Sequence, residues 1–172
     1  VTINGSAFKN CSNLKTMHIS NNVAQLVSTS FEGCVSLEEV NIPDNVTDVN
    51  YRMFVDSPIK KLHLGKSLKS VTHVLFRTRD YMNRKTEKIT VDKDNQNFEV
   101  KNDALLTKDG KVLITFFGNE EIYQIPDTVE TIMDGAFCGC NTLKDIIIPE
   151  SVTEIRNGAF ENCGNLTDIT LP

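Results

Sequence analysis

The stretch from Gly135 to Pro149 reads GAFCGCNTLKDIIIP, and the stretch from Gly158 to Pro172 reads GAFENCGNLTDITLP. The two phrases start 23 residues apart (158 − 135) and share Phe, Cys, Leu, Ile and Pro at the same places. A sequence pattern that occurs twice in one chain either supplies the same functional residues twice or builds the same structural unit twice. Periods of roughly 20–50 residues are typical of repeat solenoids, so the phrase should recur elsewhere in the chain.

The phenylalanine of the phrase does recur. Its positions are Phe8, Phe31, Phe54, Phe76, Phe137 and Phe160, with spacings of 23, 23, 22, 61 and 23 residues. One such unit cannot bury its own apolar face, whereas stacked units share a continuous core. The pattern therefore predicts a single curved solenoid over residues 1–172, in which these phenylalanines form a buried ladder.

Each unit contains strand and turn signals. Val40 and Ile42 alternate with polar neighbours, which is strand periodicity, and Pro43 ends the strand because it has no N–H to donate. A second extended piece follows. Phe31 and Cys34, three residues apart, then predict a short 3₁₀-like or α-helical turn. The expected fold is a repeat solenoid, mixed β with short helical turns, with one parallel strand per repeat of about 23 residues.

The cysteines follow the repeat. Cys11, Cys34, Cys140 and Cys163 each stand three residues after a phenylalanine, and Ser57 and Arg79 occupy this place in the other repeats. We interpret the position as one that needs a small buried residue, because free cysteine behaves as a small hydrophobe. Only Cys138 and Cys140 show the short spacing of a zinc ligand pair. We therefore expect buried thiols without metal.

The repeat is interrupted between residues 92 and 123. In this segment Asp109-Gly110 separates two apolar runs, which is a strong hairpin signal. We predict a β-hairpin from Ala104 to Phe117 that replaces the helical side of one coil. The chain is thus expected to be one solenoid with an irregular insert, and a slice of a longer array.

Composition disfavours several classes of partner. The 172 residues carry a net charge of −5, and a mildly acidic chain without a basic block is a poor candidate for binding nucleic acid. No apolar run approaches the ~18 residues of a membrane span, so no membrane insertion is expected within this segment.

Few residues suggest chemistry. His18 and His63 share a repeat column about two coils apart, too far to bind one metal. The segment DKDNQN from Asp92 lacks the Gly and Glu of a calcium loop, and no G-x-S-x-G motif occurs. We therefore predict no catalytic site, metal site or cofactor, and no enzymatic activity.

The unit IPxxVTxIxxGAFxxCxxLxxIxIP resembles the BspA-type leucine-rich repeat of bacterial and protist surface proteins. IPDTVETIMDGAFCGCNTLKDIIIP and IPESVTEIRNGAFENCGNLTDITLP carry the resemblance most clearly. It implies that the solenoid is of the leucine-rich-repeat type. It also implies a secreted or cell-surface, non-enzymatic ectodomain that adheres to a protein partner of the host extracellular matrix or of another cell. A structural spacer that holds another domain away from the cell surface is the alternative.

Recognition should use the outward strand positions, because packing fixes the buried ones. Lys60, Lys61, His63 and Lys88 form the only outward cluster of one charge sign, so they are the candidate partner-binding residues. The chain is expected to act as a monomer, with an acidic protein surface docking across the third and fourth repeats.

Overall fold

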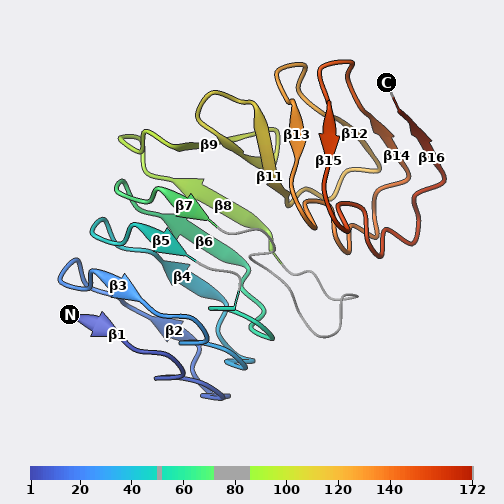
Figure 1. Ribbon diagram of the computed structural model, residues 1–172. Helices are drawn as coiled ribbons and strands as arrows, with labels where there is room; N and C mark the ends of the chain where they lie inside the picture. The colour runs from blue at the N-terminus through green and yellow to red at the C-terminus, as the bar shows by residue number, and fades with distance from the viewer. Residues whose placement is uncertain (50–51, 72–85, 172) are drawn as a thin grey trace.

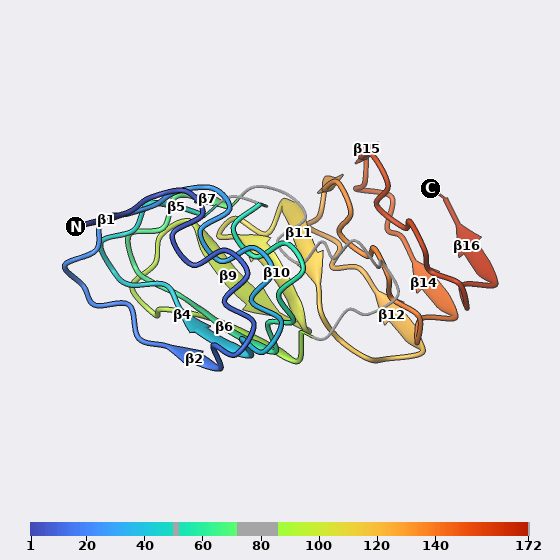
Figure 2. The same ribbon diagram turned by 90° about the horizontal axis from the view of Figure 1, so that it is seen from below.

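The structure, a computed structural model, describes residues 1–49, 52–71 and 86–171. The predicted ladder residue Phe76 lies outside these ranges, as do His73 and Arg79. The chain winds into stacked coils that follow an arc (Figure 1). Most coils contribute one strand to each of two opposite faces, which lie along the lower and upper sides of Figure 2.

We call these two faces A and B. Face A contains β2 (Thr16–Met17), β4 (Glu39–Asn41), β6 (Lys61–Leu64), β8 (Lys88–Val91), β12 (Ile122–Gln124), β14 (Asp145–Ile147) and β16 (Asp168–Thr170). Face B contains β1 (Thr2–Ile3), β3 (Gln25–Leu26), β5 (Asp48–Val49), β7 (Ser70–Val71), β11 (Val112–Phe116), β13 (Thr131–Ile132) and β15 (Glu154–Ile155). The insert adds β9 (Phe98–Lys101) and β10 (Ala104–Thr107).

Neighbouring coils pair in parallel and in repeat register. On face A, Val40 lies beside Leu62 and Leu62 beside Ile89, and all three are buried. The predicted parallel strand of each repeat is thus confirmed, and the second extended piece forms the short strands of face B. Face A is divided into two sheets, β2-β4-β6-β8 and β12-β14-β16.

The predicted short helical turns are wrong in detail, because the described residues contain no helix. The Phe turn does carry i→i+3 hydrogen bonds, such as Leu37 N–H to the Cys34 carbonyl at 2.9 Å. Residues with positive φ interrupt it two places before the phenylalanine, at Ser6, Thr29, Gly135 and Gly158, and two places after it, at Asn10, Gly33, Asp56, Gly139 and Asn162. A right-handed helix cannot continue through such residues, so each turn is a series of separate tight turns.

The phenylalanine ladder forms among the described residues. Ring centroids lie 5.5 Å apart for Phe8–Phe31, 5.7 Å for Phe31–Phe54 and 5.0 Å for Phe137–Phe160, all stacked. The backbone repeats with the rings, since Phe31 N–H donates to the Met53 carbonyl at 3.1 Å and Phe137 N–H to the Ala159 carbonyl at 2.7 Å. Each coil therefore holds the next through both its rings and its backbone.

The cysteine column has a hydrogen-bonding role that the sequence analysis missed. The Cys34 thiol donates to the Phe8 carbonyl at 3.0 Å, and the Cys163 thiol donates to the Phe137 carbonyl at 3.1 Å. The Ser57 hydroxyl makes the same contact to the Phe31 carbonyl at 2.6 Å. The position therefore requires a small side chain that can donate a hydrogen bond to the preceding coil.

Burial of this column is only partly as predicted. Cys34 and Cys140 are buried, Cys163 is half-buried, and Cys11 is exposed. Cys11 lies in the first coil, which only one other coil covers. Burial raises the pKa of the Cys34 thiol, and this desolvation outweighs the hydrogen bond from the Cys11 backbone. Cys34 is therefore protonated and able to donate at neutral pH.

The predicted hairpin is confirmed and is part of a larger insert. β10 pairs antiparallel with β11 and also with β9, which was not predicted. β11 then pairs in parallel with β13, so the hairpin supplies a face-B strand rather than a helical side. At its end Phe116 stacks on Phe137 at 5.3 Å and thereby supplies the missing rung of the ladder.

The β10–β11 hairpin separates two hydrophobic cores and packs against both. Leu105 and Ile114 pack with the core of the N-terminal coils, while Leu106 and Leu113 pack with the core of the C-terminal coils. Successive side chains of a strand point to opposite faces. A strand that is buried on both faces reads as a continuous apolar run, which explains the sequences ALL and VLI.

The ladder predicts a graded loss of stability. Phe137 is fully buried, so Phe137→Ala should lower the free energy of unfolding by ~3–5 kcal/mol. Phe8 is only partly buried in the first coil, so Phe8→Ala should cost clearly less. Urea unfolding followed by circular dichroism measures both. Equal losses for the two variants would contradict the ladder.

The column of donors predicts a difference between two substitutions of Ser57, which is buried. Ser57→Ala leaves the Phe31 carbonyl with the longer 3.4 Å bond from Cys34 N–H, and should cost about 1–3 kcal/mol of unfolding free energy. Ser57→Cys restores a donor of the kind that Cys34 provides, and should cost less. Thermal unfolding of the two variants decides this, and the donor role is wrong if Ser57→Cys is no better than Ser57→Ala.

Candidate binding surface

The solvent side of the β2-β4-β6-β8 sheet presents two outward columns. The first contains Thr16, Glu39, Lys61 and Lys88, which are in register across the four strands. The second contains Asn41, His63 and Thr90, with His18 directly after β2. The structure therefore confirms the strand register on which the candidate site was predicted.

Three of the four candidate residues share one depression. Lys61, His63 and Lys88 line a shallow pocket of about 290 Å³, together with Glu39, Val40, Asn41, Leu62 and Thr90. Lys61 lies opposite Lys88, and His63 lies opposite Thr90. His63 Nδ1 is 2.9 Å from Thr90 Oγ1, which holds the imidazole beside its neighbouring strand.

Lys60 does not line this pocket. It precedes β6, and its ammonium is 2.8 Å from the Glu38 carboxylate. This hydrogen bond raises the pKa of Lys60, and burial opposes the increase. Lys60 is thus engaged with a neighbouring coil, and the predicted cluster separates into one ion-paired lysine and three residues that line the pocket.

Charge in the pocket is predominantly positive. Among the described residues, no carboxylate lies within ion-pair distance of Lys61 or Lys88, although Glu39 stands opposite Lys61. By contrast, Lys111 and Lys144 pair at 2.7 Å with Glu130 and Glu121 on adjacent coils. Lys61 and Lys88 are therefore available to an incoming acidic group.

The second half of face A has a different character. Asp145 and Asp168 continue the first column in β14 and β16, but Ile122 begins it in β12. Ile122 and Ile147 are exposed. The basic depression is therefore confined to the N-terminal sheet.

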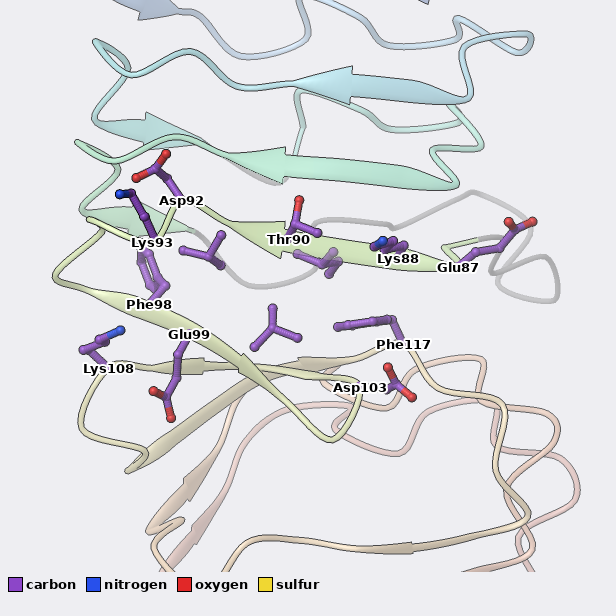
Figure 3. Close-up of a pocket in the computed structure, with 13 residues that line it drawn as sticks. Glu87, Lys88, Thr90, Asp92, Lys93, Phe98, Glu99, Asp103, Lys108 and Phe117 are labelled. Carbon is purple, nitrogen blue, oxygen red and sulfur yellow. The ribbon is translucent and has the colours of Figure 1, made fainter.

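A second pocket was not predicted. It has a volume of about 570 Å³ and lies between β8 and β9, where the insert interrupts face A (Figure 3). Its apolar lining is Ile89, Val91, Phe98, Val100 and Phe117. The break in the repeat was the available signal, because a sheet that loses one strand must leave an edge.

Other groups of the described residues suggest structural roles. No three His, Cys, Asp or Glu side chains within these ranges are placed to hold a metal ion. The calcium-like segment is a corner built around buried Asn95, whose amide donates to the Gly65 and Leu68 carbonyls at 2.9 and 3.2 Å. The Asn95 side-chain oxygen accepts from the N–H groups of Asn97 and Phe98. Within the same ranges there is no helix that could cross a membrane.

These features define a leucine-rich solenoid of stacked, in-register coils with an open face. The sequence profile described as the BspA type leucine rich repeat region matches six copies over residues 1–100 and 116–172. The chain therefore belongs to this family. No protein with a curated description matches its sequence.

Solved structures agree on the fold. The pneumococcal vaccine antigen PcpA superposes with a TM-score of 0.88 at 23% identity, over 99% of this chain and 42% of PcpA. A leucine-rich repeat protein from Eubacterium ventriosum gives 0.79 at 20% identity, over 96% of this chain and 56% of the other. A leucine rich cell surface protein from Faecalibacterium prausnitzii gives 0.73 at 24% identity, over 99% and 51%. The chain thus spans about half the length of these proteins.

Tyr123 is a buried titratable residue of β12. Its ring lies 4.3 Å from that of Phe116 and 5.8 Å from that of Phe137, and its hydroxyl has no hydrogen-bond partner among the described residues. Burial raises the pKa of Tyr123 well above its usual value, and Glu120 and Asp103 add to the increase. The residue therefore belongs to the packed core and not to a reactive site.

Tyr123→Phe should stabilise the protein by about 1 kcal/mol at pH 7, because it removes an unpaired buried hydroxyl. The raised pKa means that the folded state holds the phenolic proton more tightly than the unfolded state does. Ionisation of Tyr123 therefore leaves the free energy of unfolding unchanged below pH ~10 and lowers it as pH rises above this value. The variant lacks this group, so its free energy of unfolding should fall less at high pH. Urea unfolding at pH 7 and pH 11 measures both effects; a variant that is less stable at pH 7 would contradict them.

Proposed function

We propose that this chain is a non-enzymatic binding module of a secreted or cell-surface protein, and that it adheres to a protein of the host extracellular matrix or of another cell. Membership of the BspA-type family supports a binding role, and the Faecalibacterium relative is described as a cell surface protein. Repeat solenoids commonly use extended surfaces for recognition.

The observation that carries the proposal is the basic depression on face A. Lys61, His63 and Lys88 converge there from two adjacent strands, on a scaffold that in-register pairing keeps rigid. An acidic patch on a protein partner would place carboxylates against the two lysines, with Lys60 and its partner Glu38 at the rim. Such exposed charges act mainly on the rate of association and are screened by salt.

The partner is first isolated with the immobilised chain from host extracellular matrix and cell-surface extracts. The double variant Lys61→Gln and Lys88→Gln should then weaken its binding by about tenfold, mainly through slower association. Both side chains are exposed, so the unfolding midpoint should change little. Affinity of the parent should fall as salt rises from 50 to 300 mM.

The control removes two lysines elsewhere. Lys69→Gln and Lys101→Gln change the net charge equally at exposed positions outside the depression, and should leave affinity near that of the parent. Equal effects of the two double variants would show that only net charge matters. Failure to capture any partner would favour the spacer role.

A further inference from the structure

Among the described strands, the β2-β4-β6-β8 sheet ends at an edge of β8 that has no pairing partner. β8 is the last strand of β2-β4-β6-β8, and among the described strands it pairs with β6 alone. β9 lies beside it but pairs with β10. A strand in this position offers a row of backbone donors and acceptors to another chain.

The hydrogen bonds to β6 show which groups form that row. Lys88 N–H donates to the Lys60 carbonyl at 3.0 Å, and Asp92 N–H donates to the Leu64 carbonyl at 2.9 Å. Alternate residues of a parallel strand direct their N–H and C=O groups to opposite edges. The backbone groups of Ile89 and Val91 therefore point away from β6, towards the pocket between β8 and β9.

The pocket is apolar in its floor and fixed in shape. Phe98 and Phe117 are buried, and Val100 is 37% exposed at its wall. Asn95 fixes the corner between β8 and β9 through its four hydrogen bonds. The two strands diverge from this corner (Figure 3), which leaves room along the edge of β8.

At the open end of the pocket, carboxylates outnumber ammonium groups among the described residues. Glu87, Lys88 and Asp103 lie at this end, whereas Lys93 and Lys108 lie at the other end with Asp92 and Glu99 (Figure 3). Among the described residues, the open end thus presents two carboxylates and one ammonium. A ligand with a basic group at this end would complement it.

We propose that the outer edge of β8 takes up an extended segment of a partner polypeptide as a fifth strand, with an apolar side chain in the pocket and a basic residue beside Glu87 and Asp103. A polypeptide backbone is the chemistry that matches a row of alternating donors and acceptors, and strand addition to a sheet edge is an established recognition mode. β9 approaches β8 at their shared corner, so the partner would pair along the part of β8 that diverges from β9, which is shorter than the ~13 Å that the four residues of β8 span. This site shares Lys88 and Thr90 with the basic depression, but it uses the backbone edge of β8 and does not rest on the function proposed for the depression.

The test uses the peptide acetyl-Arg-Thr-Val-Thr-Val-Thr-amide and the whole chain labelled with ¹⁵N. At a peptide concentration ten times the dissociation constant, hydrogen exchange of the Ile89 and Val91 amides should slow about tenfold. Two further peptides carry methyl groups on alternate backbone nitrogens, one in each register. At least one of these should lose binding, and replacing Arg by Glu should weaken it.

Protein variants locate the site. Val100→Lys places an ammonium in the pocket and should weaken peptide binding about tenfold, whereas Val35→Lys at another exposed valine should not. Lys61→Gln should weaken binding of the proposed acidic protein partner and leave peptide binding unchanged, so the two proposals can fail separately. Absence of binding, or chemical-shift changes on β4 and β6 without protection of Ile89 and Val91, would overturn the proposal.

Discussion

The structure depends on register between coils. A coil of about 23 residues is too small to bury its own apolar side chains, and its strands have no partners within the coil. Both needs are met only when the next coil lies one repeat further along the chain. The Phe31 N–H bonded to the Met53 carbonyl and the Ser57 hydroxyl bonded to the Phe31 carbonyl exist only in this register. Packing and hydrogen bonding therefore select the same alignment, which makes a slip of one residue costly.

The insert preserves this register on one side and breaks it on the other. β11 pairs with β13 and carries Phe116 into the phenylalanine ladder, so face B and the Phe turns continue through the interruption. On face A, no described strand bridges β8 and β12. The interruption is stable because the hairpin buries apolar side chains on both of its faces, and this burial offsets the loss of one regular coil.

Periodic features could be predicted from the sequence, and non-periodic ones could not. The ladder, the parallel strands and the outward columns follow from repetition. The helical turn was wrong because residues such as Ser6 and Thr29 adopt positive φ, which their identity does not disclose. The donor role of the cysteine column was missed, although Ser57 in the same column was a signal for it. The ion pair of Lys60 with Glu38 depends on side-chain conformation, and β9 and its pocket depend on how the insert twists away from β8.

Repetition also determines where recognition can occur. Inward residues are committed to the core and most backbone groups to neighbouring coils, so a partner meets outward side chains or a broken edge. β8 offers a partner both outward side chains and a broken sheet edge. Its outward side chains, Lys88 and Thr90, belong to the basic depression, while the backbone groups of Ile89 and Val91 face the second pocket. Because side chains and backbone groups project in perpendicular directions from a strand, substitutions of outward side chains can alter one surface without removing the hydrogen-bonding groups of the other.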